Sequence, residues 1–168
     1  REGEVPTLGH WFRAGGYDTH YVGKWHITHA DLTDPETGGA LLSHGNDGTI
    51  QPEAVQAYLD ADVLDPFGFS DWVGPEPHGG KPALSGLICD GIYANRAIEF
   101  LQGRYARRAE GDEAALRPFL LVVSFVNPHD IVFAPGWLGR FGPDNPFVDD
   151  PLNPPDIPES PTDREDLS

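Results

Sequence analysis

A continuous apolar run over residues 119–126 is the feature that most constrains the fold of this chain. Ser124 alone interrupts it, and polar and apolar residues do not alternate along it. A run of this kind is typical of a strand in a parallel sheet whose two faces are both covered. Pro128 removes a backbone donor just beyond the run, so the strand is predicted to end before it. The sequence therefore predicts a buried, central parallel strand.

Two further elements give this strand its neighbours. Residues 17–22 are rich in strand-forming side chains and predict a second strand. Residues 84–108 predict a long helix, with arginines in the last turns, where cations suit the helix dipole. The apolar stripe assigned to this helix is Leu87, Ile88, Ile92, Ile98, Leu101 and Tyr105. Strand, helix and strand in this order imply a parallel pair with a right-handed crossover. The predicted fold class is therefore α/β, a mostly parallel sheet flanked by helices.

Shorter elements are predicted around this unit. A short helix begins at Pro6 and Thr7 and ends at the glycines 15–16, with Leu8, Trp11 and Phe12 as its apolar stripe. Residues 52–59 predict another short helix and residues 67–73 a short strand. The rest of the stretch between residues 31 and 82 is broken by glycine and proline, and a long irregular excursion is usually functional.

Charge divides the chain into a predicted domain, residues 1–142, and an acidic, proline-rich extended segment, residues 143–168. The segment holds seven prolines, eight acids and one arginine, a net −7 of the chain's −16. A segment of this composition cannot form a core by itself. The overall acidity excludes a basic groove for nucleic acid and opposes binding to an anionic membrane surface. No apolar stretch approaches the length of a membrane span.

Cys89 is the one cysteine, which excludes a disulfide framework and a Cys-rich zinc site. It falls inside the predicted long helix and is interpreted as a core thiol. The chain contains no methionine and begins without a signal peptide, so we interpret it as an internal piece of a longer protein. Neither its compartment nor its oligomeric state is indicated.

Polar side chains follow both predicted strands. Lys24 and His26 follow the first strand, and His129 follows the second. In open α/β sheets, ligands bind beyond the carboxyl ends of the strands. Lys24 and His26 would share a face if the extended form continued that far. One cation and two imidazoles suit an anion. The alternative is that they are unrelated polar residues at the ends of loops.

Three blocks of sequence resemble those of type I sulfatases, in the alkaline phosphatase superfamily. Residues 16–26 read G-Y-D-T-H-Y-V-G-K-W-H and are similar to the family signature G-Y-x-T-x-x-x-G-K-W-H. Residues 118–130 are similar to the family's P-F-F-L-x-x-S-F-x-x-P-H strand and loop, and residues 84–101 to its long helix. The blocks stand in the family's order and cover roughly residues 5–130.

This resemblance implies an incomplete alkaline-phosphatase-like fold and an arylsulfatase-like activity, the hydrolysis of small-molecule or carbohydrate sulfate esters. Such enzymes use a formylglycine nucleophile, made from Cys or Ser in a C-x-P-S-R motif, and a divalent cation, usually calcium. The family's sulfate-contacting lysine falls on Lys24, its paired histidine on His26, and the histidine of the later block on His129. These three are the predicted catalytic and substrate-binding residues.

The departures from the family pattern are equally informative. The chain carries no C-x-P-S-R motif. The family's metal-binding aspartate pairs are not visible either, so no residue is assigned to a metal. Nucleophile and calcium ligands are expected outside this chain, which alone is expected to be inactive. Two alternatives stay open: a phosphonate or phosphodiester hydrolase of the same superfamily, and a non-catalytic acidic binding module.

Other polar residues are assigned weaker roles. His29 and Asp31 could line the pocket mouth, but a capping or surface role is favoured. Residues 44–48 predict a turn rather than a metal site. Asp130 either orients His129 or caps a turn, and the acidic pair at residues 149–150 is interpreted as solvated.

Overall fold

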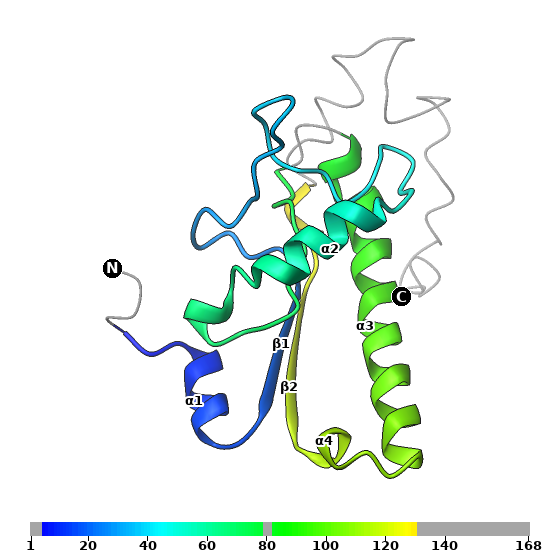
Figure 1. Ribbon diagram of the computed structural model, residues 1–168. Coiled ribbons are helices and arrows are strands. Elements are labelled where there is room, and N and C mark those ends of the chain that lie inside the picture. The colour runs from blue at the N-terminus through cyan, green and yellow to red at the C-terminus, as the bar shows by residue number, and fades with distance from the viewer. Residues whose placement is uncertain (1–4, 79–81, 131–168) are drawn as a thin grey trace, which may run out of the picture. The chain divides into compact units, whose positions relative to one another are not determined.

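The computed structural model describes residues 5–78 and 82–130. Its main helices and strands are α1 (Leu8–Ala14), β1 (Asp18–Gly23), α2 (Pro52–Ala61), α3 (Gly86–Ala109), α4 (Glu113–Leu116) and β2 (Phe119–Ser124) (Figure 1). Two short 3₁₀ helices, η1 (Asp65–Phe67) and η2 (Pro82–Leu84), lie between α2 and α3. Residues 143–168 lie outside the described residues, so the boundary at residue 142 and the solvated acidic pair stay predictions.

β1 and β2 form a parallel pair, as the sequence predicted. The register runs from Asp18 opposite Phe119 to Gly23 opposite Ser124. Within the described residues β2 has β1 as its one strand neighbour, and all of its residues are half-buried. The expected central position of β2 is therefore not seen in this part of the chain, because no described strand lies along its second edge.

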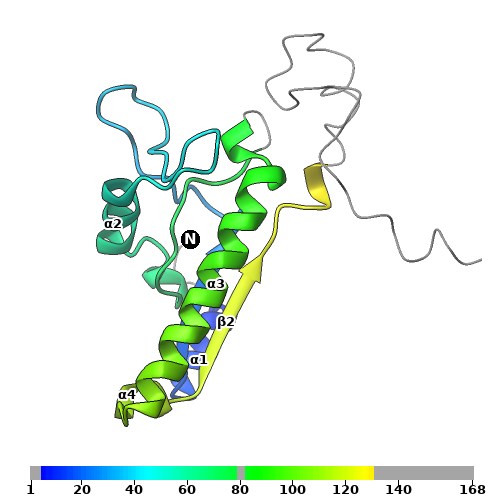
Figure 2. The same cartoon turned by 90° about the vertical axis from the view of Figure 1, so that its right-hand side faces the viewer.

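Successive residues of a strand point to opposite faces of the sheet, and a core covers each face here. Tyr21 enters an aromatic core, made of Tyr21, Trp25, Ala30, Tyr58, Leu64, Phe69, Trp72 and Val73. Val22 enters a second, helix core, made of Val22, Cys89, Tyr93 and Val126. The aromatic core draws on α2 and the segment that follows it. The helix core draws on α3, which runs along β2 in Figure 2. An α/β arrangement of helices on a parallel pair results.

The helix α3 is confirmed, but its predicted apolar stripe is right only in part: Ile92 packs against the helix core, and Ile88 and Leu101 are half-buried. The buried residues of α3 are Gly86, Cys89, Tyr93 and Arg104. Leu87 and Ile98 are each 49% exposed and Tyr105 is 65% exposed. Apolar residues occur on several sides of this helix, so periodicity did not select one face. Packing selected it: Cys89 and Tyr93 meet the sheet, and the Arg104 guanidinium reaches the Asp18 carboxylate at 3.1 Å.

The strand predicted at residues 67–73 is also wrong. Only Ser70 pairs with the sheet, as an isolated parallel bridge to His20. The backbone of Ser70 donates to Thr19 and accepts from Tyr21, and the ladder stops there. Phe69, Trp72 and Val73 are all buried in the aromatic core, which takes consecutive side chains that a ladder would place on opposite faces.

The two short helices are confirmed, with a difference in what α1 buries. Thr7 caps α1 by accepting a hydrogen bond from the His10 backbone. Leu8 and Trp11, expected to face a core, are 55% and 67% exposed. The buried α1 residue is Gly9, where the helix approaches the backbone of Gly68 so closely that a β-carbon would overlap it. Within the described residues, the position of α1 is thus set by close backbone contact at Gly9 rather than by its apolar stripe.

Among the described residues, no helix combines the length and the apolar character that crossing a bilayer would require.

Candidate functional site

The end of β1 is held in place by one close backbone contact and three hydrogen bonds. Gly23 has a φ of 101°, and a β-carbon there would overlap the Ser124 carbonyl oxygen. The Lys24 N–H donates to that same carbonyl at 2.8 Å. The Tyr21 hydroxyl donates to the Lys24 carbonyl, and the Trp72 indole N–H donates to the Gly23 carbonyl, each at 2.8 Å. The backbone that presents Lys24 is therefore fixed at the carboxyl edge of the sheet.

Trp25 anchors the segment between the two candidate side chains. It is 5% exposed, and its ring centroid lies 5.2 Å from those of Tyr21 and Phe67. Its indole N–H donates to the Thr28 hydroxyl at 2.9 Å. The tryptophan of the K-W-H sequence is thus a core residue, and it leaves Lys24 half-buried and His26 exposed on either side.

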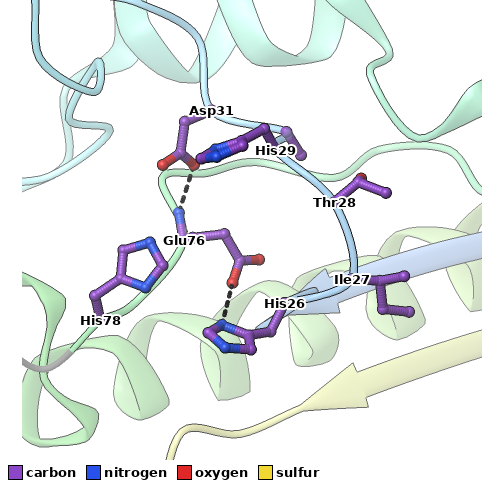
Figure 3. Close-up of a pocket in the computed structure, with 8 residues that line it drawn as sticks. His26, Ile27, Thr28, His29, Asp31, Glu76 and His78 are labelled. Carbon is purple, nitrogen blue, oxygen red and sulfur yellow. Dashed lines mark hydrogen bonds and ion pairs between the residues drawn. The ribbon is translucent and has the colours of Figure 1, made fainter.

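His26 departs from the extended geometry expected of it. β1 ends at Gly23, and His26 has a φ of 51°, in the left-handed region. The premise that Lys24 and His26 share a strand face is therefore wrong. Instead, the His26 ring turns toward the segment at residues 74–78 (Figure 3). Its Nδ1 lies 3.6 Å from Oε2 of Glu76, and its ring centroid lies 5.7 Å from that of His78.

Glu76 is the site residue that sequence reasoning missed. It is 4% exposed, and its Oε1 accepts a hydrogen bond from the Trp25 N–H at 2.6 Å. Its own N–H donates to Oδ1 of Asp31 at 2.7 Å. Glu76 stands between two prolines, in a stretch that reads as an ordinary loop. The sequence offers little that could have found it beyond a lone acid two residues before a histidine.

These groups border a cavity of about 250 Å³. Its lining residues are His26, Ile27, Thr28, His29, Ala30, Asp31, Glu76 and His78 (Figure 3). Both readings offered for His29 and Asp31 apply: the two residues line the cavity, while His29 is exposed and Asp31 caps the backbone N–H of Glu76. The site is rich in imidazole nitrogens, which can donate or accept hydrogen bonds.

His129 follows β2 through a loop that α3 holds. The Asp90 carboxylate accepts from the Val126 and Asn127 N–H groups at 2.6 and 3.1 Å. Asp130 is 2% exposed, and its Oδ2 accepts from the Gly86 N–H at 2.6 Å. Its Oδ1 lies 3.3 Å from Nδ1 of His129. Asp130 therefore contacts His129, the residue that the first alternative has it orient, and it caps the start of α3 rather than a turn.

The two segments that carry Lys24, His26 and His129 leave the sheet at the same edge. This follows from the parallel pairing, in which Gly23 and Ser124 stand opposite each other. The side chain of His129 is half-exposed there. The convergence of all three side chains on a single anion stays a prediction.

Cys89 and His44 form a separate buried contact. The Cys89 thiol donates to the Ala83 carbonyl at 3.2 Å, and the His44 Nε2–H donates to the same carbonyl at 2.6 Å. Burial raises the pKa of the Cys89 thiol to about 12 and lowers the pKa of His44. Cys89 is fully buried, as expected of a core thiol. His44 opens the predicted turn, which closes between Gly45 and Thr49.

The calcium site implied by the family resemblance has no counterpart among residues 5–78 and 82–130. No group of three His, Cys, Asp or Glu side chains there is arranged to hold a metal ion. Each cavity-lining acid uses one oxygen to accept a backbone N–H, Asp31 that of Glu76 and Glu76 that of Trp25. The described residues thus do not fit a calcium ion, and no catalytic step is assigned to one.

Comparison with known proteins identifies one family. The family model described as Sulfatase matches residues 1–153 of the 168. No curated protein and no solved structure matches the chain.

Proposed function

The chain belongs to the sulfatase family, and from this premise we propose that it forms the anion-recognition part of a sulfuric ester hydrolase. The arrangement at the end of β1 supports this most directly. Gly23 turns the chain against β2, Trp25 anchors it in the aromatic core, and the backbone of Lys24 is bonded to the end of β2 at the carboxyl edge of the sheet. Ligands of parallel α/β sheets bind at this edge.

Each candidate side chain has a role in this proposal. Lys24 contributes a compact positive charge that compensates the negative charge developing on the ester and sulfate oxygens in the transition state. His26 hydrogen-bonds the sulfate. His129 donates a proton to the departing oxygen. The chain's net charge of −16 does not oppose this, since salt screens exposed charges beyond about 8–10 Å.

The substrate we propose is a sulfate ester of a small molecule or a carbohydrate. The formylglycine nucleophile and the divalent cation, both implied by the family resemblance, come from outside these 168 residues in this proposal. The sequence carries no C-x-P-S-R motif, and the described residues hold no metal-binding group. What this chain supplies is the binding and orientation of the anion and the proton for the leaving group.

The test is a substrate panel, assayed on the protein that contains both this chain and the segment bearing the nucleophile. An aryl sulfate, an aryl phosphonate and an aryl phosphodiester with the same leaving group are compared by kcat/KM. Preference for the sulfate supports the proposal. Preference for the phosphonate or the phosphodiester favours the other hydrolase of the superfamily. No turnover of any ester, with the nucleophile verified by mass spectrometry, favours the non-catalytic binding module.

A further inference from the structure

Glu76 carries a buried carboxylate that the proposed function does not use. Its side chain is 5% exposed. One oxygen, Oε1, accepts from the Trp25 N–H at 2.6 Å, whereas Oε2 is buried and has no hydrogen-bond partner among the described residues. A buried carboxylate oxygen costs free energy unless a donor satisfies it. Nδ1 of His26 lies 3.6 Å from Oε2, and Figure 3 shows the two groups facing each other.

The same carboxylate therefore acts on two consecutive residues. Through Oε1 it binds the backbone of Trp25, and through Oε2 it faces the ring of His26. His26 has a left-handed backbone, a conformation that L-residues adopt when their surroundings impose it. The His26 side chain is otherwise 61% exposed, so few contacts besides Glu76 and the edge of His78 restrict its ring.

We propose that Glu76 is a positioning residue for His26. The Glu76 carboxylate accepts a hydrogen bond from Nδ1–H of His26, which leaves Nε2 as the ring nitrogen that meets the substrate. An ionised carboxylate only accepts hydrogen bonds, so the single proton of a neutral imidazole must then reside on Nδ1. The meeting of Nε2 with a sulfate oxygen rests on the proposed function. The tautomer does not, and it can be measured without any substrate.

The first experiment reads the His26 tautomer from imidazole ¹⁵N chemical shifts in long-range ¹H–¹⁵N spectra of the wild-type chain and of Glu76→Gln. In the wild type we expect Nδ1 to carry the proton. In Glu76→Gln the amide oxygen keeps the Trp25 N–H and the amide NH₂ then faces Nδ1, so the proton is expected to move to Nε2. Glu53→Gln, which removes an exposed charge on α2, is the matched control and is expected to leave the tautomer unchanged.

The wild-type spectrum alone already tests the tautomer, so the inference does not depend on the folding of the variant. An Nε2–H tautomer in the wild type would overturn it, and so would an Nδ1–H tautomer that persists in folded Glu76→Gln.

The second experiment is a double-mutant cycle in the active protein, with Glu76→Gln, His26→Ala and both together. Glu76→Gln is expected to lower kcat/KM by about 10- to 100-fold, as for other partners that orient a functional histidine. Because Glu76 acts through His26, the double variant is expected to lose no more than His26→Ala does. If the losses in kcat/KM of the two single variants multiply in the double variant, Glu76 has a structural role separate from His26, and the inference is overturned. Full activity of His26→Ala would instead overturn the role that the proposed function gives His26.

Discussion

Gly23 lies so close to Ser124 that a β-carbon at position 23 would overlap the Ser124 carbonyl oxygen. That carbonyl accepts the Lys24 N–H at 2.8 Å, one residue past the end of β1. A positive φ at Gly23 combines this close approach with a change of direction, and a side chain would disturb both. The glycine of the G-K-W-H sequence is therefore a backbone requirement of the segment that presents Lys24.

Gly23→Ala is expected to destabilise the fold by about 2–4 kcal/mol, since backbone strain and overpacking add at this position. The matched control is Gly91→Ala on α3, where a β-carbon meets nothing within 4 Å. There the substitution is expected to stabilise the protein by about 0.5–1 kcal/mol, because alanine favours the helix. Urea unfolding midpoints of the two variants measure the difference. Equal midpoints would contradict the close contact.

Lys24→Ala is expected to lower kcat on a sulfate ester by about 100-fold or more, because it removes a cation whose effect is largest in the transition state. Arg108→Ala removes an exposed cation from the end of α3 and is the control for net charge. The measurement is steady-state kinetics on the active protein. Equal effects of the two substitutions would exclude a local role for Lys24.

His129→Ala is expected to slow esters with poor leaving groups more than esters with good ones, because a good leaving group needs no proton. The measurement is a series of aryl sulfates whose leaving phenols differ in acidity, with kcat/KM plotted against that acidity. The variant is expected to show the steeper dependence. Parallel lines for variant and wild type would count against proton donation by His129.

Cys89 is expected to resist alkylation in the folded chain at pH 8. Its thiol is fully buried, and burial raises its pKa to about 12, so almost no thiolate forms at that pH. Mass spectrometry after iodoacetamide treatment measures the modified fraction, with the same treatment in denaturant as the positive control. Rapid modification of the native protein would show that the helix core is open.

His44 is expected to make stability fall on mild acidification. Burial lowers the pKa of His44 in the folded protein below its ordinary value of about 6.5, so the unfolded chain binds a proton more readily. The titration of His44 leaves the free energy of unfolding unchanged above about pH 6.5 and lowers it as the pH falls through that value. We expect the stability advantage of the wild type over His44→Asn to shrink between pH 7 and pH 5. Urea unfolding of both proteins measures it, because carboxylate effects common to both cancel. A constant difference would contradict the depressed pKa.

Local patterns in the sequence predicted the main elements. The signals for β1, for the helix before β2 and for β2 itself each lie within a short stretch of sequence. The order strand, helix, strand then implied the parallel pair. The same patterns placed Lys24 and His129 beyond strand ends that the register brings side by side. Resemblance of residues 16–26 and 118–130 to the sulfatases indicated the family, which the family model confirms.

Tertiary structure alone decided the rest, because it depends on partners that are distant along the chain. Glu76 accepts a hydrogen bond from the backbone of Trp25, 51 positions away, and the spacing of residues along a helix or strand cannot predict a contact of this kind. The buried face of α3 is the one on which Cys89 and Tyr93 meet the sheet and Arg104 meets Asp18, 86 positions away, and only part of the apolar stripe lies on it. His26 left the strand face because β1 ends at Gly23 and the chain turns toward the Glu76 loop. The sequence by itself determined β1, β2 and the main helices. Packing decided where Ser70 stops pairing with the sheet and which side chains meet at the site, since close packing selects one of many sterically allowed rotations and turns.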